Sequence, residues 1–315
     1  MSAHYWRNAG QPEKNGFVSL KNGYHGETLG ALSVTDIPLF KDTYAPLLRH
    51  SVQVPTPDAR LAEPGETAEA FALRCAAVLE AHLAEHAATT AALIVEPLVQ
   101  GAAGMAMYHP IYLARARELC DQYGVHLIAD EIAVGFGRTG SMFACEQAGI
   151  KPDFICLSKG ITGGYLPLSA VLTTDDVYAA FYDEATARGF LHSHTYTGNP
   201  LACRAALAVL DIFEHDQIMA ATRIKSIEMT AALAEVAAHI QVRHFRHRGM
   251  IWAFDVAGAG PDFSTRFHFA ALAQGVFIRP IGNTVYLMPP YVVTPDEMTL
   301  LAERVLLALK RSLAS

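Results

Sequence analysis

Short apolar runs that each stop at a charged residue limit most strongly how this chain can fold. The three runs and the charged residues that follow them are Ala91–Val95 with Glu96, Val125–Ala129 with Asp130, and Phe154–Leu157 with Lys159. Helical patterns separate the runs, and this alternation is typical of a mostly parallel sheet covered on both faces. Ligands of such sheets bind outside the carboxyl ends of the strands. The sequence therefore predicts that the three charged residues converge at one end of a sheet.

The rest of the pattern predicts a second, smaller domain. In the first part we expect helices near 66–85, 112–123 and 201–238 and a further strand over 168–172. In the last part we expect strands over 241–248, 250–256, 276–279 and 284–288, and helices near 267–274 and over 295–313. Thr294 suits the N-cap of the last helix, and Gly282-Asn283 suits a hairpin turn. The predicted fold is α/β, with a large domain over 1–216 and a small α+β domain over 217–315.

Composition excludes several classes of protein. Of 315 residues, 51% are hydrophobic, which is too many for a disordered chain. The net charge of −7 argues against nucleic-acid binding, and no apolar run is long enough to span a membrane. Five scattered cysteines form no C-x-x-C pair and the 14 histidines form no H-E-x-x-H motif, so no metal or disulfide framework is expected. We expect a cytoplasmic enzyme that acts on small molecules.

Asp130 and Lys159 carry the strongest chemical prediction. A lysine at a strand end can use its amine to attack a carbonyl carbon, or it can be an ordinary surface lysine. A carboxylate at a strand end can pair with a protonated ring nitrogen, or it can cap a helix. Pyridoxal phosphate needs both groups, because lysine forms a Schiff base with it and aspartate keeps its pyridine nitrogen protonated. Ile132 could pack against the flat ring or simply in the core.

Two further segments give weaker signals. Gly135–Gly140 lacks G-x-G-x-x-G spacing and does not open a helix directly after a strand, so we reject a dinucleotide loop and expect a tight turn. His192–Pro200 is rich in small hydrogen-bond donors before a predicted helix. Such a segment can bind a phosphate, because hydroxyl and free helix N–H groups donate to it. The alternative is an ordinary capped loop.

Taken together, these residues resemble a known family. The run Asp130–Gly140, followed by Ser158-Lys159-Gly160 and Gly163-Gly164, is similar to class III, fold-type I pyridoxal-phosphate aminotransferases, and the resemblance covers essentially the whole chain. It implies pyridoxal 5'-phosphate as cofactor, transamination in two half-reactions and a homodimer. Four segments narrow it to members that transfer an amino group from S-adenosylmethionine to 8-amino-7-oxononanoate in biotin biosynthesis: 22–28, 96–110, 194–203 and 279–291.

The resemblance also implies roles for single residues. Lys159 is the catalytic residue that holds the cofactor and moves the reacting proton. The implied cofactor-binding residues are Lys159, Asp130, Ile132, Tyr24, His25 and Thr195, and the implied substrate-binding residues are Arg279, Tyr24, Tyr286 and Gly160. Thr195 is expected to bind the phosphate in the neighbouring subunit, and Glu96 and Gln100 to line the cofactor side. Arg279 suits a substrate carboxylate because its guanidinium is a planar donor set, although a structural salt bridge is the alternative.

The start of the chain departs from the family's pattern. The family has a Ser-Gly-Ser phosphate-binding turn just before the helix that is expected to begin here at Met1, and an N-terminal segment that lines the substrate pocket. We therefore expect an N-terminally truncated member that lacks part of the phosphate and substrate sites. The alternatives are another class III aminotransferase that uses lysine, ω-amino acids or ornithine derivatives, and an inactive fragment that serves only as a dimer partner.

Overall fold

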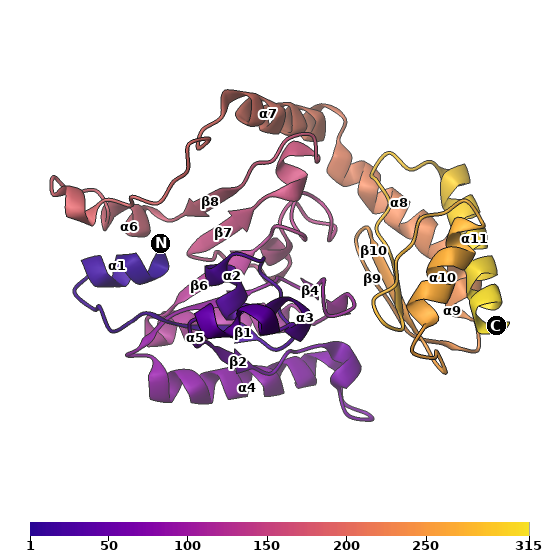
Figure 1. The fold of residues 1–315 in the computed structure, drawn as a ribbon, viewed down its shortest axis with the longest axis horizontal. Helices are drawn as coiled ribbons and strands as arrows, with labels where there is room; N and C mark the ends of the chain where they lie inside the picture. Colours follow the sequence, from indigo (N-terminus) through magenta and orange to yellow (C-terminus); the bar gives the residue numbers. More distant parts are fainter. Residues whose placement is uncertain (315) are drawn as a thin grey trace. The chain divides into compact units, whose positions relative to one another are not determined.

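The chain divides into two compact units (Figure 1). The computed structural model describes residues 1–314. Unit 1 comprises residues 1–136 and 143–211, and unit 2 comprises residues 137–142 and the chain from Ile212 onward. The sequence predicts a division after residue 216. The units part a few residues earlier, and the short segment Gly137–Met142 belongs to the second unit although it lies within the first part of the sequence.

Unit 1 is built on a six-stranded sheet in the order β2-β1-β3-β6-β7-β8. The strands are β1 (Gly16–Leu20), β2 (Val52–Val54), β3 (Thr90–Val95), β6 (His126–Asp130), β7 (Phe154–Leu157) and β8 (Ala170–Thr173). All neighbours are parallel except β7 and β8, which are antiparallel. The predicted mostly parallel sheet is confirmed. Its central strand β3 is almost completely buried, as expected of an apolar run covered on both faces.

Two helices of unit 1, α4 and α5, confirm the helices predicted near 66–85 and 112–123. They are α1 (Ser2–Asn8), α2 (Leu29–Val34), α3 (Pro38–Lys41), α4 (Ala68–His86), α5 (Ile111–Tyr123) and α6 (Asp175–Ala179), while α7 (Pro200–His215) runs across the division into unit 2. Thr67 caps α4 by accepting a hydrogen bond from Ala70 N. Gly124 ends α5 in a left-handed conformation, with φ of 60°. The short strands β4 (Val99–Gln100) and β5 (Ala106–Met107) form a separate antiparallel pair.

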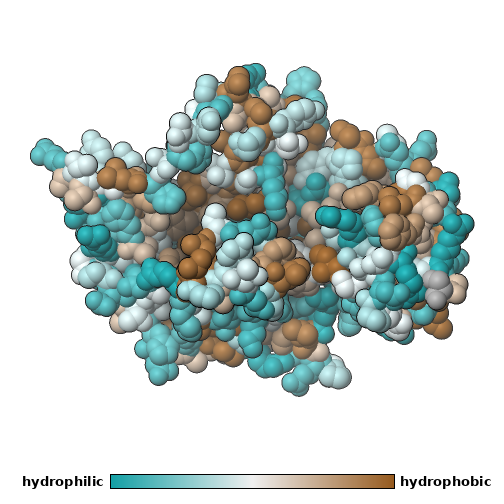
Figure 2. Space-filling view, in the orientation of Figure 1, coloured by the Kyte–Doolittle hydropathy of each residue, from teal (hydrophilic) through white to brown (hydrophobic). Residues whose placement is uncertain are grey.

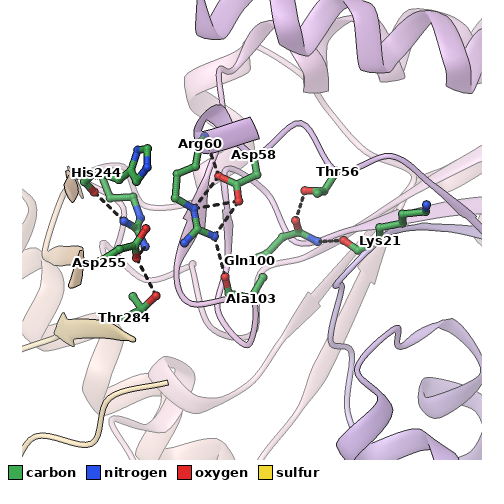
Figure 3. Close-up of polar contacts among 10 residues, drawn as sticks. Lys21, Thr56, Asp58, Arg60, Gln100, Ala103, His244, Asp255 and Thr284 are labelled. Carbon is green, nitrogen blue, oxygen red and sulfur yellow. Dashed lines mark hydrogen bonds and ion pairs between the residues drawn. The ribbon is translucent and has the colours of Figure 1, made fainter. Parts of the chain in front are cut away.

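Unit 2 packs helices on a three-stranded antiparallel sheet in the order β11-β10-β9. Its elements are α8 (Ile218–Ala232), α9 (Ala234–Ala237), β9 (Val242–Arg248), β10 (Ile251–Val256), α10 (Phe263–Leu272), β11 (Thr284–Leu287) and α11 (Pro295–Ala314). Its core contains the buried rings of Trp252, Phe254 and Phe267. Across the sheet, Asp255 accepts hydrogen bonds from Arg246 and Thr284 (Figure 3). The predicted N-cap of α11 is confirmed, since Glu297 N donates to Thr294 Oγ1.

Three predictions for this region are wrong in detail. Residues 276–279 form no strand, because Ile278 is buried alone between exposed neighbours and its carbonyl accepts from the His268 ring instead of from a strand partner. The helix expected near 267–274 begins at Phe263. The helical stretch expected over 201–238 is interrupted at Gln217, whose φ of 49° is left-handed. Among the helices of residues 1–314, none is long and apolar enough to cross a membrane.

Candidate active site

The carboxyl ends of three adjacent strands carry the site. β3, β6 and β7 are neighbours in the sheet, and Asp130 at the end of β6 lies in register with Cys156 on β7. Glu96 follows β3 directly, and Lys159 follows β7 after Ser158. The predicted convergence of charged residues at one end of the sheet is confirmed. Parallel strands produce it, because all of their carboxyl ends face the same way.

Asp130 is held by a histidine from the loop that follows β1. His25 Nδ1 lies 2.8 Å from Asp130 Oδ2, and the other carboxylate oxygen accepts from Ile132 N at 3.2 Å. Turns, and no helix, follow Asp130 in residues 131–140, so Asp130 does not cap a helix. The spacing of residues did not reveal this pairing, since His25 is 105 positions away from Asp130. Only the resemblance singled out His25.

Glu96 links two loops at the same end of the sheet. Its Oε1 accepts from Tyr24 N at 2.9 Å and its Oε2 from Gly101 N at 3.0 Å. Complete burial raises the pKa of the Glu96 carboxyl to about 7, although the nearby His25 and the two main-chain donors oppose the shift. Glu96 is therefore a buried carboxyl that can carry a proton near neutral pH.

Tyr24 and Gln100 are both engaged with protein groups. The Tyr24 hydroxyl donates to Glu27 Oε1 at 2.8 Å, and its ring lies 5.1 Å from that of Phe40. Burial and the bond to Glu27 raise the pKa of Tyr24 to about 12. Gln100 accepts from the Thr56 hydroxyl and donates to the Lys21 carbonyl at 3.1 Å (Figure 3). Gln100 thus joins two loops beside the site, as a polar side chain with its hydrogen bonds satisfied by protein.

Lys159 opens a short 3-10 turn, Lys159–Thr162. Its φ of 45° is left-handed, which is uncommon for a residue with a Cβ and often marks a functional position. The side chain is exposed, and within residues 1–314 its amine makes no hydrogen bond or ion pair. Ser158 anchors the start of the turn by donating to the Leu168 carbonyl at 2.7 Å. An exposed amine is thus left available just after β7.

Thr195 lies in the exposed loop before α7. Asn199 Oδ1 accepts from Leu201 N and Ala202 N at 3.0 and 3.2 Å, so Asn199 caps α7. A cavity of about 1240 Å³ borders this loop. Its lining includes Met1, Ser2, Cys156, Ser158, His194 and Tyr196. The predicted phosphate-binding loop therefore stays accessible beside the strand that leads to Lys159.

Arg279 and Tyr286 lie in unit 2, whereas the other predicted site residues lie in unit 1. Arg279 is exposed, and its guanidinium lies 6.0 Å from the centre of the Phe277 ring. It forms no ion pair within residues 1–314, so the alternative of a structural salt bridge finds no support there. Tyr286 lies on β11, opposite Ala253.

The groups at the carboxyl ends fit pyridoxal phosphate. Asp130 accepts two hydrogen bonds, and a carboxylate has about four acceptor positions, so a protonated ring nitrogen can be accepted as well. The available Lys159 amine supplies the group that the cofactor needs. These two residues are the pair on which the sequence prediction rests.

Comparisons with known proteins agree with this chemistry. The family model described as aminotransferase class-III matches residues 1–309. The adenosylmethionine-8-amino-7-oxononanoate aminotransferase of Geobacter sulfurreducens is 42% identical over 96% of this chain and 69% of its own length. The crystal structure of the enzyme of that name from Methanocaldococcus jannaschii has a TM-score of 0.89, with 33% identity over 98% of this chain and 71% of that one.

A further solved structure bears on the cofactor. An amine transaminase from an uncultivated Pseudomonas species, solved in its pyridoxal-phosphate-bound form, has a TM-score of 0.91 and 35% identity over 99% of this chain and 73% of that one. The predicted fold, the predicted aminotransferase class and its pyridoxal phosphate cofactor are thereby confirmed. The chain belongs to the class III aminotransferase family.

Proposed function

We propose that this chain is a pyridoxal-phosphate-dependent aminotransferase of biotin biosynthesis that transfers an amino group from S-adenosylmethionine to 8-amino-7-oxononanoate. The product is 7,8-diaminononanoate. The names of relatives that match nearly the whole chain support this substrate pair. The observation that carries the proposal is the available Lys159 amine just after β7, the strand that pairs with β6 and its buried Asp130 carboxylate. The competing activity is that of an amine transaminase, which one of the solved relatives has.

The residues of unit 1 divide the work on the cofactor. When bound, pyridoxal phosphate supplies an electron-accepting ring for the bonds that break at the amino carbon of the substrate. Lys159 would hold the cofactor covalently and move a proton with its Nζ atom. Asp130 would keep the proton on the ring nitrogen, and His25 orients the carboxylate. Tyr24 and Ile132 would lie against the two ring faces.

Recognition of the substrate is assigned to three further residues. We assign the substrate carboxylate to Arg279, whose guanidinium has no carboxylate partner within residues 1–314. We also assign Tyr286 and Gly160 to substrate binding. Arg279 and Tyr286 belong to unit 2, and Gly160 belongs to unit 1.

The working form would be a homodimer in the cytoplasm. Thr195 would reach the cofactor phosphate in the neighbouring subunit, and its exposure in the loop before α7 supports this. Large apolar side chains on the same part of the chain are exposed, among them Tyr165, Leu191, Tyr196 and Leu201. Apolar residues also gather over α7 on the face drawn in Figure 2. Exposed apolar residues gathered on one part of a surface are typical of a protein interface. The five unpaired cysteines suit a reducing compartment.

A reaction with single amino donors tests the proposal. The protein is reconstituted with pyridoxal phosphate and mixed with 8-amino-7-oxononanoate and one donor at a time: S-adenosylmethionine, lysine or a simple primary amine. Mass spectrometry then measures 7,8-diaminononanoate. We expect product with S-adenosylmethionine and none with Lys159→Ala. In a parallel reaction that offers pyruvate as the acceptor, amination of pyruvate by a simple amine, with none of 8-amino-7-oxononanoate by any donor, would favour an amine transaminase. No amination of either acceptor would favour an inactive dimer partner.

A further inference from the structure

Two bulky residues at the carboxyl end of the sheet have strained backbones. Phe136 has a φ of 53° and Lys159 a φ of 45°. A left-handed conformation is a genuine outlier for a large side chain such as phenylalanine, and it persists only where the surroundings enforce it. Phe136 lies in the loop after β6, and Lys159 opens the turn after β7.

Gly160 joins these two positions. A Cβ atom built on Gly160 would lie 2.9 Å from Phe136 Cβ, 3.0 Å from Cδ2 and 3.1 Å from Cγ. The Phe136 side chain therefore lies directly on the main chain of Gly160, the residue that follows Lys159. Any side chain at position 160 would push Phe136 or the Lys159 turn out of place. The φ of Gly160 is not left-handed, so the contact with Phe136, and not the backbone conformation, makes glycine necessary there.

Packing and hydrogen bonds within its own loop hold Phe136 in place. It is almost completely buried, and its ring contacts the Phe143 ring edge-to-face at 5.8 Å. The loop that carries both rings is closed by Glu131, whose two carboxylate oxygens accept from Ala144 N and Cys145 N. Gly135 N also donates to the Glu131 carbonyl at 2.9 Å. The loop of Phe136 is thus held by its own packing and hydrogen bonds, so Phe136 can restrict the conformation of the Lys159 turn.

We propose that Phe136 is a positioning residue for Lys159: its ring, pressed on Gly160, holds the Lys159 turn in its strained conformation and so fixes where the amine starts. The inference rests on the proposed function only for the use made of the amine, since the positioning itself is a property of the chain. Removal of the ring should loosen the turn. A methyl group at position 160 should displace it.

Amide hydrogen exchange in the cofactor-free protein tests the positioning directly. The turn contains two main-chain hydrogen bonds, from Ile161 N to the Ser158 carbonyl and from Gly163 N to the Gly160 carbonyl, both 3.1 Å long. We expect exchange at these amides to speed up more than tenfold in Phe136→Leu and in Gly160→Ala. Phe71→Leu is the matched control, because Phe71 is also a buried phenylalanine but lies on α4. It should change exchange at the turn less than twofold.

A steric rescue separates positioning from general loss of core packing. In the double variant Phe136→Gly with Gly160→Ala, all three Phe136 atoms near the new methyl group are removed, and glycine adopts a positive φ freely. We expect its turn to exchange more slowly than that of Gly160→Ala. Unchanged exchange at the turn in both Phe136→Leu and Gly160→Ala would overturn the proposal. If one of the two variants does not fold, unchanged exchange in the other is enough to overturn it.

The cofactor-loaded protein then shows whether the positioned amine is used. Borohydride should fix the cofactor to Lys159 at least tenfold more slowly in Phe136→Leu and Gly160→Ala than in the wild type and Phe71→Leu. Wild-type protein that fixes no cofactor at Lys159 would refute the proposed function and leave the exchange result standing. If the amides of the turn exchange faster in the two variants than in the wild type but borohydride fixes the cofactor to Lys159 at equal rates, the positioning of the amine is refuted and the proposed function still holds.

Discussion

His25 Nδ1 and Asp130 Oδ2 lie 2.8 Å apart, and both side chains are almost completely buried, at 2% and 7% exposure. The histidine comes from the loop after β1 and the aspartate from the end of β6, so the contact joins two parts of the sheet end that are far apart in sequence. A buried carboxylate is stable only when it is paired or hydrogen-bonded. His25 and Ile132 N supply those partners, and they leave room for one more donor on the carboxylate.

Asp130→Asn should abolish most turnover while the cofactor stays attached. The amide cannot hold a proton on the ring nitrogen, so kcat should fall by orders of magnitude.

His25→Gln should lower kcat less, on the order of tenfold to a hundredfold, since a hydrogen bond to a charged group contributes about 1.5–3 kcal/mol. Steady-state kinetics and cofactor absorbance measure both effects. Asp153→Asn, which breaks the ion pair with Arg117, is the control and should lower the Tm with little change in kcat. Near-normal kcat in Asp130→Asn would remove Asp130 from the mechanism.

Glu96 should make the folding stability depend on pH. Its pKa is about 7 in the folded chain against an ordinary value of 4.5, so the folded chain binds the proton more tightly than the unfolded chain does. The protonated Glu96 therefore contributes to the free energy of unfolding, and this contribution is complete below about pH 4.5 and is lost as the pH rises through 7. Glu96→Gln cannot titrate. The difference in free energy of unfolding, wild type minus Glu96→Gln, should therefore fall between pH 4.5 and 7 and stay constant above about pH 8. A difference that does not change with pH would contradict a protonated Glu96.

Much of the site could be predicted because its residues follow strands that the sequence marks clearly. Apolar runs ending at Glu96, Asp130 and Lys159 predict a parallel sheet with converging charges, and the sheet confirms it. The partner of Asp130 could not be predicted from spacing, because a contact over 105 residues depends on the order of the strands. The sequence predicts a strand over 276–279 because this segment and 284–288 flank the Gly282-Asn283 turn signal, but Ile278 is buried alone between exposed neighbours and has no strand partner. The packing of Phe136 on Gly160 left no signal in the sequence beyond a glycine after the lysine.

The exposed edge of the unit 1 sheet should make the chain associate. β8 is the last strand of that sheet, and Val171 and Leu172 on it are 48% and 51% exposed. Apolar edge strands pair readily with other chains, and a lysine on the edge prevents this. Light scattering over a series of protein concentrations measures the average mass. We expect this mass to be lower for Val171→Lys than for the wild type at high concentration, with the Tm nearly unchanged. Leu39→Lys, which removes an exposed leucine on α3, is the control. An equal effect of both variants would exclude a specific role of the β8 edge.

The proposed homodimer predicts complementation between two inactive variants. If Thr195 reaches the phosphate of the neighbouring subunit, Lys159→Ala and Thr195→Val each impair both sites of a homodimer. A mixed dimer collects both defects in one site and leaves the other intact. After subunit exchange at equal concentrations, activity should recover to about a quarter of the wild-type value, because half of the dimers are mixed and each has one good site. Proven exchange with no recovery would show that Thr195 acts within its own subunit.

Lys159 should be the residue to which the cofactor is attached, and this can be measured on the protein itself. The protein is reconstituted with pyridoxal phosphate, reduced with borohydride, digested and mapped by mass spectrometry. We expect the added cofactor mass on the peptide that contains Lys159, and we expect Lys159→Ala to gain no such mass. Cofactor fixed to another lysine, such as Lys151 or Lys21, or to none, would contradict it.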